Sequence, residues 1–461
     1  MTEVAEASTP ASPRARPARR GVGELSYRLD PEIVERLASG EPAWLADDRR
    51  AALEAYGTLP IEPNQLYTSY VDLRAANLGE VVAWEPSRDA VPDVGVAPEG
   101  TAATASFVEG DVASIAITDE AAGAGVRVVP LADFVKQDPE AARALLVDAL
   151  PADDRLAQLS RAAWSQGVFV HVPAGVRLDH PIVVRWSVGV PGRALHARTI
   201  VQLGEGASAS LVEEIVASDA AVAGSQGLFT STSEIHLGTG SRLAMASLQE
   251  AGPDQVVFQQ RRATIGEGAD LRWALAQLGG RLVRSRVDNV LAGDRSTVEQ
   301  VEIVFGADEQ LHDLTSYTRH VGRDTTGQLL SKGVLLDKAR SYLKGLITIE
   351  RSAIGTDSYL GEFGMNLSKS ARAVAIPSLE IDQPDCRRAA HASSVGPIDE
   401  TQLFYLETRG IDPEEARKFI VLGFLEPVVV RVPLEEAQDR LRDALEAKWA
   451  AGFAPDAATA A

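Results

Sequence analysis

The stretch LGEGASASLV, residues 203–212, indicates how the central part of this chain folds. It begins with an apolar residue, two glycines one residue apart and a small residue, and this pattern returns as LGTGS at residues 237–241 and IGEGA at residues 265–269. A weaker copy, LAGD, occupies residues 291–294. The first glycines of successive copies are 34, 28 and 27 residues apart. Periods of this length are typical of stacked structural units, each of which buries an apolar face against its neighbours.

The segments between these copies have the character of β-strands. From Gly167 to about Ile381, runs rich in Val, Ile, Leu and Thr alternate with glycine and carry few helix signals. A dinucleotide-binding glycine loop must open a helix, whereas here each glycine pair precedes another strand-like run. We therefore predict a mainly β protein whose core is a right-handed parallel β-helix. Glycines supply positive φ angles at its corners, and the small residues beside them allow close stacking of the coils.

Helical patterns precede and follow the predicted solenoid. After it, Asp399 and Asp412 can each cap a helix, with Gln402 and Glu415 in the reciprocal position three residues later. Pro433 can begin a third helix. We expect five regions, which are a disordered tail at 1–22, a mixed and largely helical domain at 23–165, the β-helix at 166–385, a helical domain at 386–450 and a tail at 451–461.

The composition limits the classes of partner and compartment. The formal net charge is −20, from 45 Lys and Arg against 65 Asp and Glu, which argues against a surface for nucleic acid or anionic membrane. A single cysteine excludes an internal disulfide framework and fits a reducing cytosol. No apolar run approaches the ~18 residues that a membrane span requires. We expect a soluble, cytoplasmic protein.

Two residues near the end of the predicted solenoid are candidate metal ligands. His391 lies at the junction with the helices without bulky apolar neighbours, so its imidazole could bind iron or zinc. From the residues alone, a structural histidine that bonds a backbone carbonyl is the favoured interpretation. Cys386 could be a second ligand or a buried bystander thiol. The other six histidines are dispersed, and none has the spacing of a metal site.

Several short motifs occur in a combination that is specific to one family. Near His391 they are HASSVG (391–396), DETQLFYL (399–406) and RGI (409–411). Upstream they are WS (164–165), GVFVHVP (167–173), LDKAR (336–340), LSK (367–369) and PSLEI (377–381). Over about residues 155–450 the chain resembles the SufB/SufD family, the scaffold subunits of the Suf iron–sulfur cluster assembly machine.

The resemblance implies a role for His391 and a branch within the family. The matching family histidine faces the site where the cluster is built. D-type subunits commonly carry a cysteine two residues before it, where this chain has Ala389, and Cys386 is five residues before it. B-type subunits place glutamate directly after the histidine, where this chain has Ala392, and carry a further cysteine. The chain therefore resembles SufD, which lends one ligand and a surface to a transient iron–sulfur cluster; flavin binding is left open.

The resemblance also implies partners. These are a SufB-type homologue in a heterodimer, a SufC-type ATPase on the C-terminal helices, and a second copy in a homodimer when the chain is alone. The sequence has no Walker loop, so the chain is expected to be a non-catalytic scaffold, with ATP hydrolysis supplied by its partner. The C-terminal helices carry more apolar surface than a small helical unit can bury. We expect the docking surface to contain Phe404, Tyr405, Arg409, Gly410, Phe419, Leu422 and Phe424.

Two alternatives belong to other classes of function. A β-helix lyase or glycosidase would need a groove with paired carboxylates, or a Ca²⁺ cluster with a basic residue, and is usually secreted. The acidic residues of the predicted solenoid do not cluster by motif, and no signal peptide is apparent. A B-type scaffold that nucleates a cluster by itself is the second alternative, and one cysteine disfavours it because a thiolate ligand set cannot be assembled from this chain alone.

Overall fold

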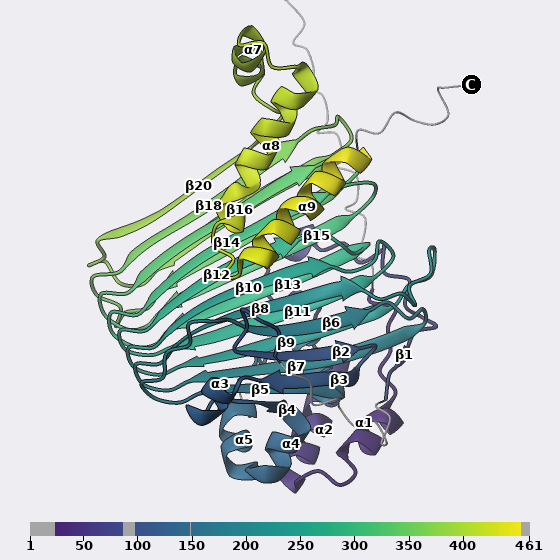
Figure 1. The fold of residues 1–461 in the computed structure, drawn as a ribbon, viewed down its shortest axis with the longest axis vertical. Helices are drawn as coiled ribbons and strands as arrows, with labels where there is room; N and C mark the ends of the chain where they lie inside the picture. The colour runs from purple at the N-terminus through teal and green to yellow at the C-terminus, as the bar shows by residue number, and fades with distance from the viewer. Residues whose placement is uncertain (1–23, 86–96, 148, 453–461) are drawn as a thin grey trace, which may run out of the picture.

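The computed structural model describes residues 24–85, 97–147 and 149–452. Its core is a β-solenoid of about 8 turns in which two ten-stranded sheets face each other (Figure 1). Successive coils add one strand to each sheet, and neighbouring strands along the solenoid are parallel. The prediction of a mainly β solenoid with helices before and after it is confirmed.

The strands of each sheet follow one another along the solenoid axis. In spatial order, the first sheet contains β19 (Arg372–Ile381), β17 (Arg340–Ile349), β15 (Leu311–His320), β13 (Leu282–Leu291), β11 (Val256–Ile265), β9 (Leu228–Leu237), β7 (Arg193–Leu203), β5 (Gln166–Val172) and β4 (Arg127–Pro130), with β1 (Val82–Ala83) beside β7. The second contains β20 (Arg388–Gly396), β18 (Asp357–Asn366), β16 (Thr326–Leu335), β14 (Thr297–Gly306), β12 (Asp270–Gln277), β10 (Arg242–Glu250), β8 (Ser208–Ala217), β6 (Ile182–Val188), β2 (Ala103–Val108) and β3 (Asp111–Ile117).

Helices flank this core in sequence. The N-terminal ones are α1 (Pro31–Ala38), α2 (Ala43–Thr58), the 3₁₀ turn η1 (Thr68–Tyr70), α3 (Asp119–Gly123), α4 (Leu131–Gln137), α5 (Pro139–Leu146) and α6 (Arg155–Ala163). The C-terminal ones are α7 (Glu400–Thr408), α8 (Pro413–Val429) and α9 (Glu435–Gly452). Among the helices of the described residues, none combines the length and apolar character needed to cross a bilayer. The predicted tails lie mainly outside these residues, and β20 falls in the region expected to be helical.

The second glycine of each predicted pair turns a corner of the solenoid. Gly206, Gly240 and Gly268 have φ angles of 65°, 65° and 62°. The equivalent residues of later coils, Arg295 and Asp324, keep this conformation at 56° and 53° without being glycine. At each of these corners the backbone N–H donates to a carbonyl of the next coil at 2.8 Å. The corners are thus joined by a continuous row of hydrogen bonds.

The first glycine of each pair serves a different purpose from the positive φ that the sequence suggested. A Cβ on Gly204 would lie 2.5 Å from the backbone nitrogen of Ala174, and one on Gly266 would lie 2.6 Å from the carbonyl oxygen of Leu237. Real Cβ atoms do not approach backbone so closely, and only glycine lets adjacent coils stack here. The small residue after each pair, such as Ala269, is fully buried.

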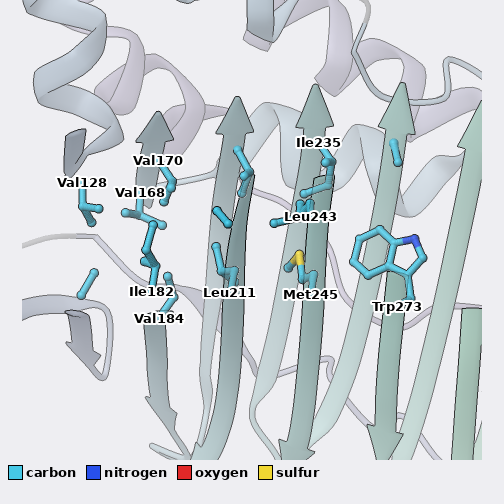
Figure 2. Close-up of a cluster of buried hydrophobic side chains, with 14 of the residues drawn as sticks. Val128, Val168, Val170, Ile182, Val184, Leu211, Ile235, Leu243, Met245 and Trp273 are labelled. Atoms are coloured by element: carbon cyan, nitrogen blue, oxygen red, sulfur yellow. The ribbon is translucent and has the colours of Figure 1, made fainter. Parts of the chain in front are cut away.

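The interior of the solenoid combines apolar and polar positions. Figure 2 shows Ile182, Leu211, Leu243 and Trp273 packed between the sheets. Strands of the same coils also carry polar groups at inward positions, and these must find partners inside the protein. Arg261, for example, donates to Ser247 at 2.7 Å and pairs with Glu213 at 3.3 Å, and all three are buried.

Glu362 on β18 is the last of these interior acids. The strand registers place it in one column with Glu302 and Ser331 of the preceding coils. Its Oε2 accepts the backbone N–H of Ile376, on β19 of the opposite sheet, at 2.8 Å. Only 1% of the residue is exposed, and this burial raises the pKa of the carboxyl to about 8. The group is therefore protonated at neutral pH.

Flanking segments cover the outer faces of both sheets. The N-terminal segment and α6 pack on the first sheet, where they bury residues such as Phe258. Helices α8 and α9 lie on the second sheet, with Leu425 and Leu441 against its outward apolar residues (Figure 1). The sheets are consequently buried on both faces through most of their length, as parallel sheets usually are.

The two ends of the solenoid differ. At the N-terminal end, β4 and β3 run antiparallel to their neighbours and finish the two sheets. Phe134 of α4 stacks on Phe169 of β5 there, with ring centroids 3.7 Å apart. At the C-terminal end, β19 and β20 are the last strands, and nothing in the described residues pairs with their outer edges.

The corner geometry predicts that the two glycines of one repeat respond differently to alanine. Gly268→Ala should cost roughly 1–2 kcal/mol of unfolding free energy, because alanine disfavours a left-handed conformation but meets open space. Gly266→Ala should cost more, because its methyl group meets the backbone of the preceding coil. Urea unfolding measures both. Gly57→Ala, in α2 with nothing near the added methyl, is the control and should not destabilise the protein.

The burial of Glu362 predicts a pH dependence of stability that one substitution removes. Since its folded pKa lies above the ordinary value of 4.5, its contribution is fully present below about pH 4.5 and is lost as the pH rises to about 8. Across this window the wild type should lose unfolding free energy relative to Glu362→Gln as the pH rises. The difference between the two proteins should change by up to ~1.4 kcal/mol per pH unit.

Urea unfolding of the two proteins at several pH values measures this difference. Glu407→Gln, on the exposed surface of α7, is the matched control and should track the wild type. If the curves of Glu362→Gln and the wild type run parallel throughout the window, the carboxyl does not hold its proton.

Candidate functional site: the open end of the solenoid and the helical arm

The open end of the solenoid, formed by β19 and β20, is the most exposed part of the β core. Strands of the preceding coils are largely buried, whereas most residues of β20 are exposed or half-buried. Apolar side chains take part in this exposure: 46% of Ile381 and 40% of Val395 is accessible. The outer backbone edges of both strands are also unpaired within the described residues. Such an edge can accept further strands.

His391 lies on β20 at this open end. It is in register with Leu360 of β18, an inward residue of the preceding coil that is 1% exposed. Since side chains alternate along a strand, His391 occupies the column that points between the sheets in earlier coils. No coil follows, so the imidazole is exposed. In the described part of the chain, no hydrogen bond or ion pair engages it.

Cys386 lies in the turn between β19 and β20. It is half-buried, and it packs with Leu379 and Ala389 against the apolar cluster that closes the last corner. The structure therefore brings Cys386 and His391 to the same end of the solenoid, with the thiol in a more apolar environment. Within the described residues, no group of three or more His, Cys, Asp or Glu side chains is arranged to hold a metal.

The interior carboxyl of Glu362 lies one coil beneath this end. It is in register with Ser393 of β20, two residues beyond His391. The sequence analysis did not single out this residue. The sequence does contain an indication of a buried acid here, because this glutamate lies between Leu360 and Gly364 at an inward position of a strand with alternating burial. Only a known register could show that this position faces the interior.

A helical arm, defined as α7 and residues 413–422 of α8, stands beyond the last strands (Figure 1). Only three residues separate it from β20, so its position is tied to that strand. Asp399 and Asp412 accept from Thr401 and Glu414 backbone N–H groups, which caps both helices. Gly410, between them, has a φ of 84° and turns the chain. The aspartate caps and the glycine turn are those that the sequence predicted, but in the described residues no hydrogen bond returns from Gln402 or Glu415 to complete the predicted capping boxes.

The arm presents three aromatic rings to solvent. Phe404 is 67% exposed, Tyr405 57% and Phe419 58%, and such large apolar groups rarely gather on a surface without a partner. Arg409 donates to the Tyr405 hydroxyl at 3.2 Å and is exposed. The remaining residues expected on the docking surface, Leu422 and Phe424, are half-buried and pack toward the second sheet. They support the base of the arm instead of extending its exposed surface.

A groove of about 620 Å³ lies on the outer face of the first sheet. Its acidic residues do not form the free pair that sugar hydrolysis needs. Asp288 accepts two hydrogen bonds from Arg286, at 2.8 and 2.9 Å, and Arg286 also stacks over Tyr317. The Asp288 carboxylate is therefore already held by an arginine, and the groove offers little support for a carbohydrate-active enzyme.

Comparison with known proteins identifies the family. The family model for the SufBD core domain of the SUF system for iron–sulfur cluster assembly matches residues 187–424. The iron–sulfur cluster assembly protein SufD of Bacillus subtilis is 26% identical over 419 residues, which is 88% of this chain and 94% of the relative.

Two further relatives carry the family name. A SufBD family protein of Staphylococcus epidermidis is 25% identical over 87% of this chain and 89% of its own length. One of Staphylococcus haemolyticus is 25% identical over 92% of both. The SufD name of the Bacillus relative agrees with Ala392, where B-type subunits place glutamate, whereas Ala389 departs from the common D-type pattern. The predicted resemblance is confirmed, and the chain belongs to the SufBD family of iron–sulfur cluster assembly proteins.

Proposed function

We propose that this chain is a D-type scaffold subunit that lends a surface and one ligand to a nascent iron–sulfur cluster. The observation that carries the proposal is the contrast between the two ends of the solenoid. The N-terminal end is finished by antiparallel strands, while the C-terminal end leaves β19 and β20 exposed. Membership of the SufBD family supports cluster assembly as the process.

The partner at the open end is a SufB-type homologue. A second solenoid can pair with both exposed edges at once, because the two sheets end in the same coil. Ile381 and Val395 would be covered in such a complex. His391 would then lie at the interface, where the cluster is cargo that takes its other ligands from the partner. Without that homologue, a second copy of this chain occupies the same edges.

The partner on the arm is a SufC-type ATPase. Phe404, Tyr405 and Phe419 are the exposed anchors that such a protein would cover, with Arg409 and Gly410 at the turn between the helices. Large aromatic side chains and arginine commonly dominate the energy of an interface. In this arrangement the partner hydrolyses ATP, and the chain itself remains non-catalytic.

The docking proposal predicts that a charge in place of one aromatic ring prevents assembly. Phe419→Asp should lower the affinity for the ATPase at least about 30-fold, equivalent to ~2 kcal/mol for an interface anchor. Co-purification and mass determination of the complex measure this. Val222→Asp, at an equally exposed position away from the arm, is the matched control and should bind normally. Normal binding by Phe404→Asp, Tyr405→Asp and Phe419→Asp alike would remove the arm from the interface.

The ligand proposal predicts that His391→Ala lowers cluster content without disturbing assembly. The exposed imidazole contributes little packing, so the fold and the mass of the complex should not change. Iron and sulfide in the complex purified without oxygen should decrease. Cys386→Ser is the comparison, and we expect a smaller loss because the thiol packs against the core. Undiminished iron and sulfide in His391→Ala would make the histidine structural, and loss in Cys386→Ser alone would transfer the role to the cysteine.

A further inference from the structure

Helix α8 is interrupted at a defined point along its length. Pro427 lies inside the helix and has no N–H, so the carbonyl of Gly423 four residues earlier receives no helical hydrogen bond. Gly423 itself has an ordinary helical conformation, and a Cβ placed on it would meet nothing within 4 Å. Neither a positive φ nor close packing therefore requires glycine there. Glycine leaves the backbone of a helix more conformational freedom than alanine does, so it makes this point of α8 more flexible.

The interruption separates two packed bodies. Beyond it, Leu425, Val428 and Val429 are fully buried against the second sheet and α9. Arg431 links this part to the second sheet, since it donates to the carbonyl of Pro427 at 2.7 Å and to Glu299 of β14 at 2.8 Å. Lys332 of β16 donates to the carbonyl of Phe424 at 2.9 Å. From Phe424 onward the helix is thus anchored to the solenoid.

Before the interruption, contact with the cluster on the second sheet is made by Val421 and Leu422 at the base of the arm. The rest of the arm consists of α7 packed on the first part of α8, where Leu403 and Ala416 are buried. An ion pair of 2.8 Å between Lys418 and Glu446 links the arm to α9. Both partners are partly exposed, and ion pairs of this kind contribute little stability. This pair can therefore break and re-form readily.

There is room for the arm to move. A groove of about 480 Å³ separates it from the last two coils. Phe363, Met365 and Ser394 line the solenoid side of this groove, and Phe419 and Ile420 line the arm side. The structure therefore contains the two features that a hinge motion requires. One is a flexible point in the helix, and the other is an unfilled space into which the arm can move.

We propose that the arm turns as a rigid unit about Gly423, with the Lys418–Glu446 ion pair as a weak latch and the groove over the last coils as the space into which it moves. Only three residues connect β20 to α7, so a motion of the arm would displace the strand that carries His391. That consequence rests on the proposed docking of an ATPase, whereas the hinge itself is a property of the isolated chain.

The test measures distances in the full chain without any partner. In a Cys386→Ser background, spin labels are placed at Glu407→Cys on the arm and Arg272→Cys on β12, both exposed. Pulsed electron resonance then gives the distribution of the distance between them. Gly423→Ala and Pro427→Ala should each narrow this distribution roughly twofold, because the first stiffens the backbone at the hinge and the second restores the missing helical hydrogen bond. Lys418→Ala should broaden it, because it removes the latch.

Gly57→Ala, the matched glycine in α2, should leave the distribution as it is. The hinge is refuted if Gly423→Ala and Pro427→Ala leave the width unchanged, or if Gly57→Ala narrows it equally. ATPase co-purification with Gly423→Ala separates this inference from the proposed function. Retained binding with a narrowed distribution supports the hinge, and absence of binding even to the wild type would overturn the docking proposal without affecting the distance result.

Discussion

The fold depends on how closely one coil can approach the next at the corners. Two backbones meet there at a distance that leaves no room for a Cβ at Gly204 or Gly266, and the next turn of the chain needs a left-handed residue. Once these two requirements are met, the backbone N–H at each corner reaches the following coil, and the strands on either side fall into register. Register then decides which side chains point inward, because a shift by one residue would exchange the two faces of every strand.

Register also explains why polar residues are tolerated inside the solenoid. Glu213 and Ser247 lie in register on β8 and β10 of the second sheet, and Arg261 reaches them from β11 of the first sheet. They satisfy one another only because the strands hold them at fixed heights. A buried ion pair of this kind adds little net stability, but it favours one alignment of the strands over others. The N-terminal segment is fixed by the same means: Glu62 pairs with Arg284 at 2.5 Å on the outer face of the first sheet, and both are almost fully buried.

The sequence predicted the parts of the molecule that repeat. Glycine pairs at a steady spacing identified the solenoid, and acidic caps with a glycine between them identified α7 and α8. It assigned one role to both glycines of a pair, because a close approach between coils is invisible before the coils are stacked. It identified His391 and Cys386 through a family motif, but their difference in environment, one exposed on the last strand and the other packed in a corner, depends on where the solenoid ends. The apolar residues after Asp399 were expected to form a small bundle with a docking face. Much of that apolar surface, including Leu422 and Phe424, instead packs toward the second sheet.

The open end and the arm are linked by a short connection, and this gives them a mechanical relation. Strand β20 has a neighbour on one side only, so it is held less firmly than any strand within the sheets. The same strand continues directly into α7, while the second half of α8 is anchored on earlier strands of the same sheet. A force applied to the arm is therefore resisted by the anchored half of α8 and transmitted to the least supported strand. Glu362 adds to this, because its carboxyl joins β18 to the edge strand β19 from within, directly beneath the coil that carries His391.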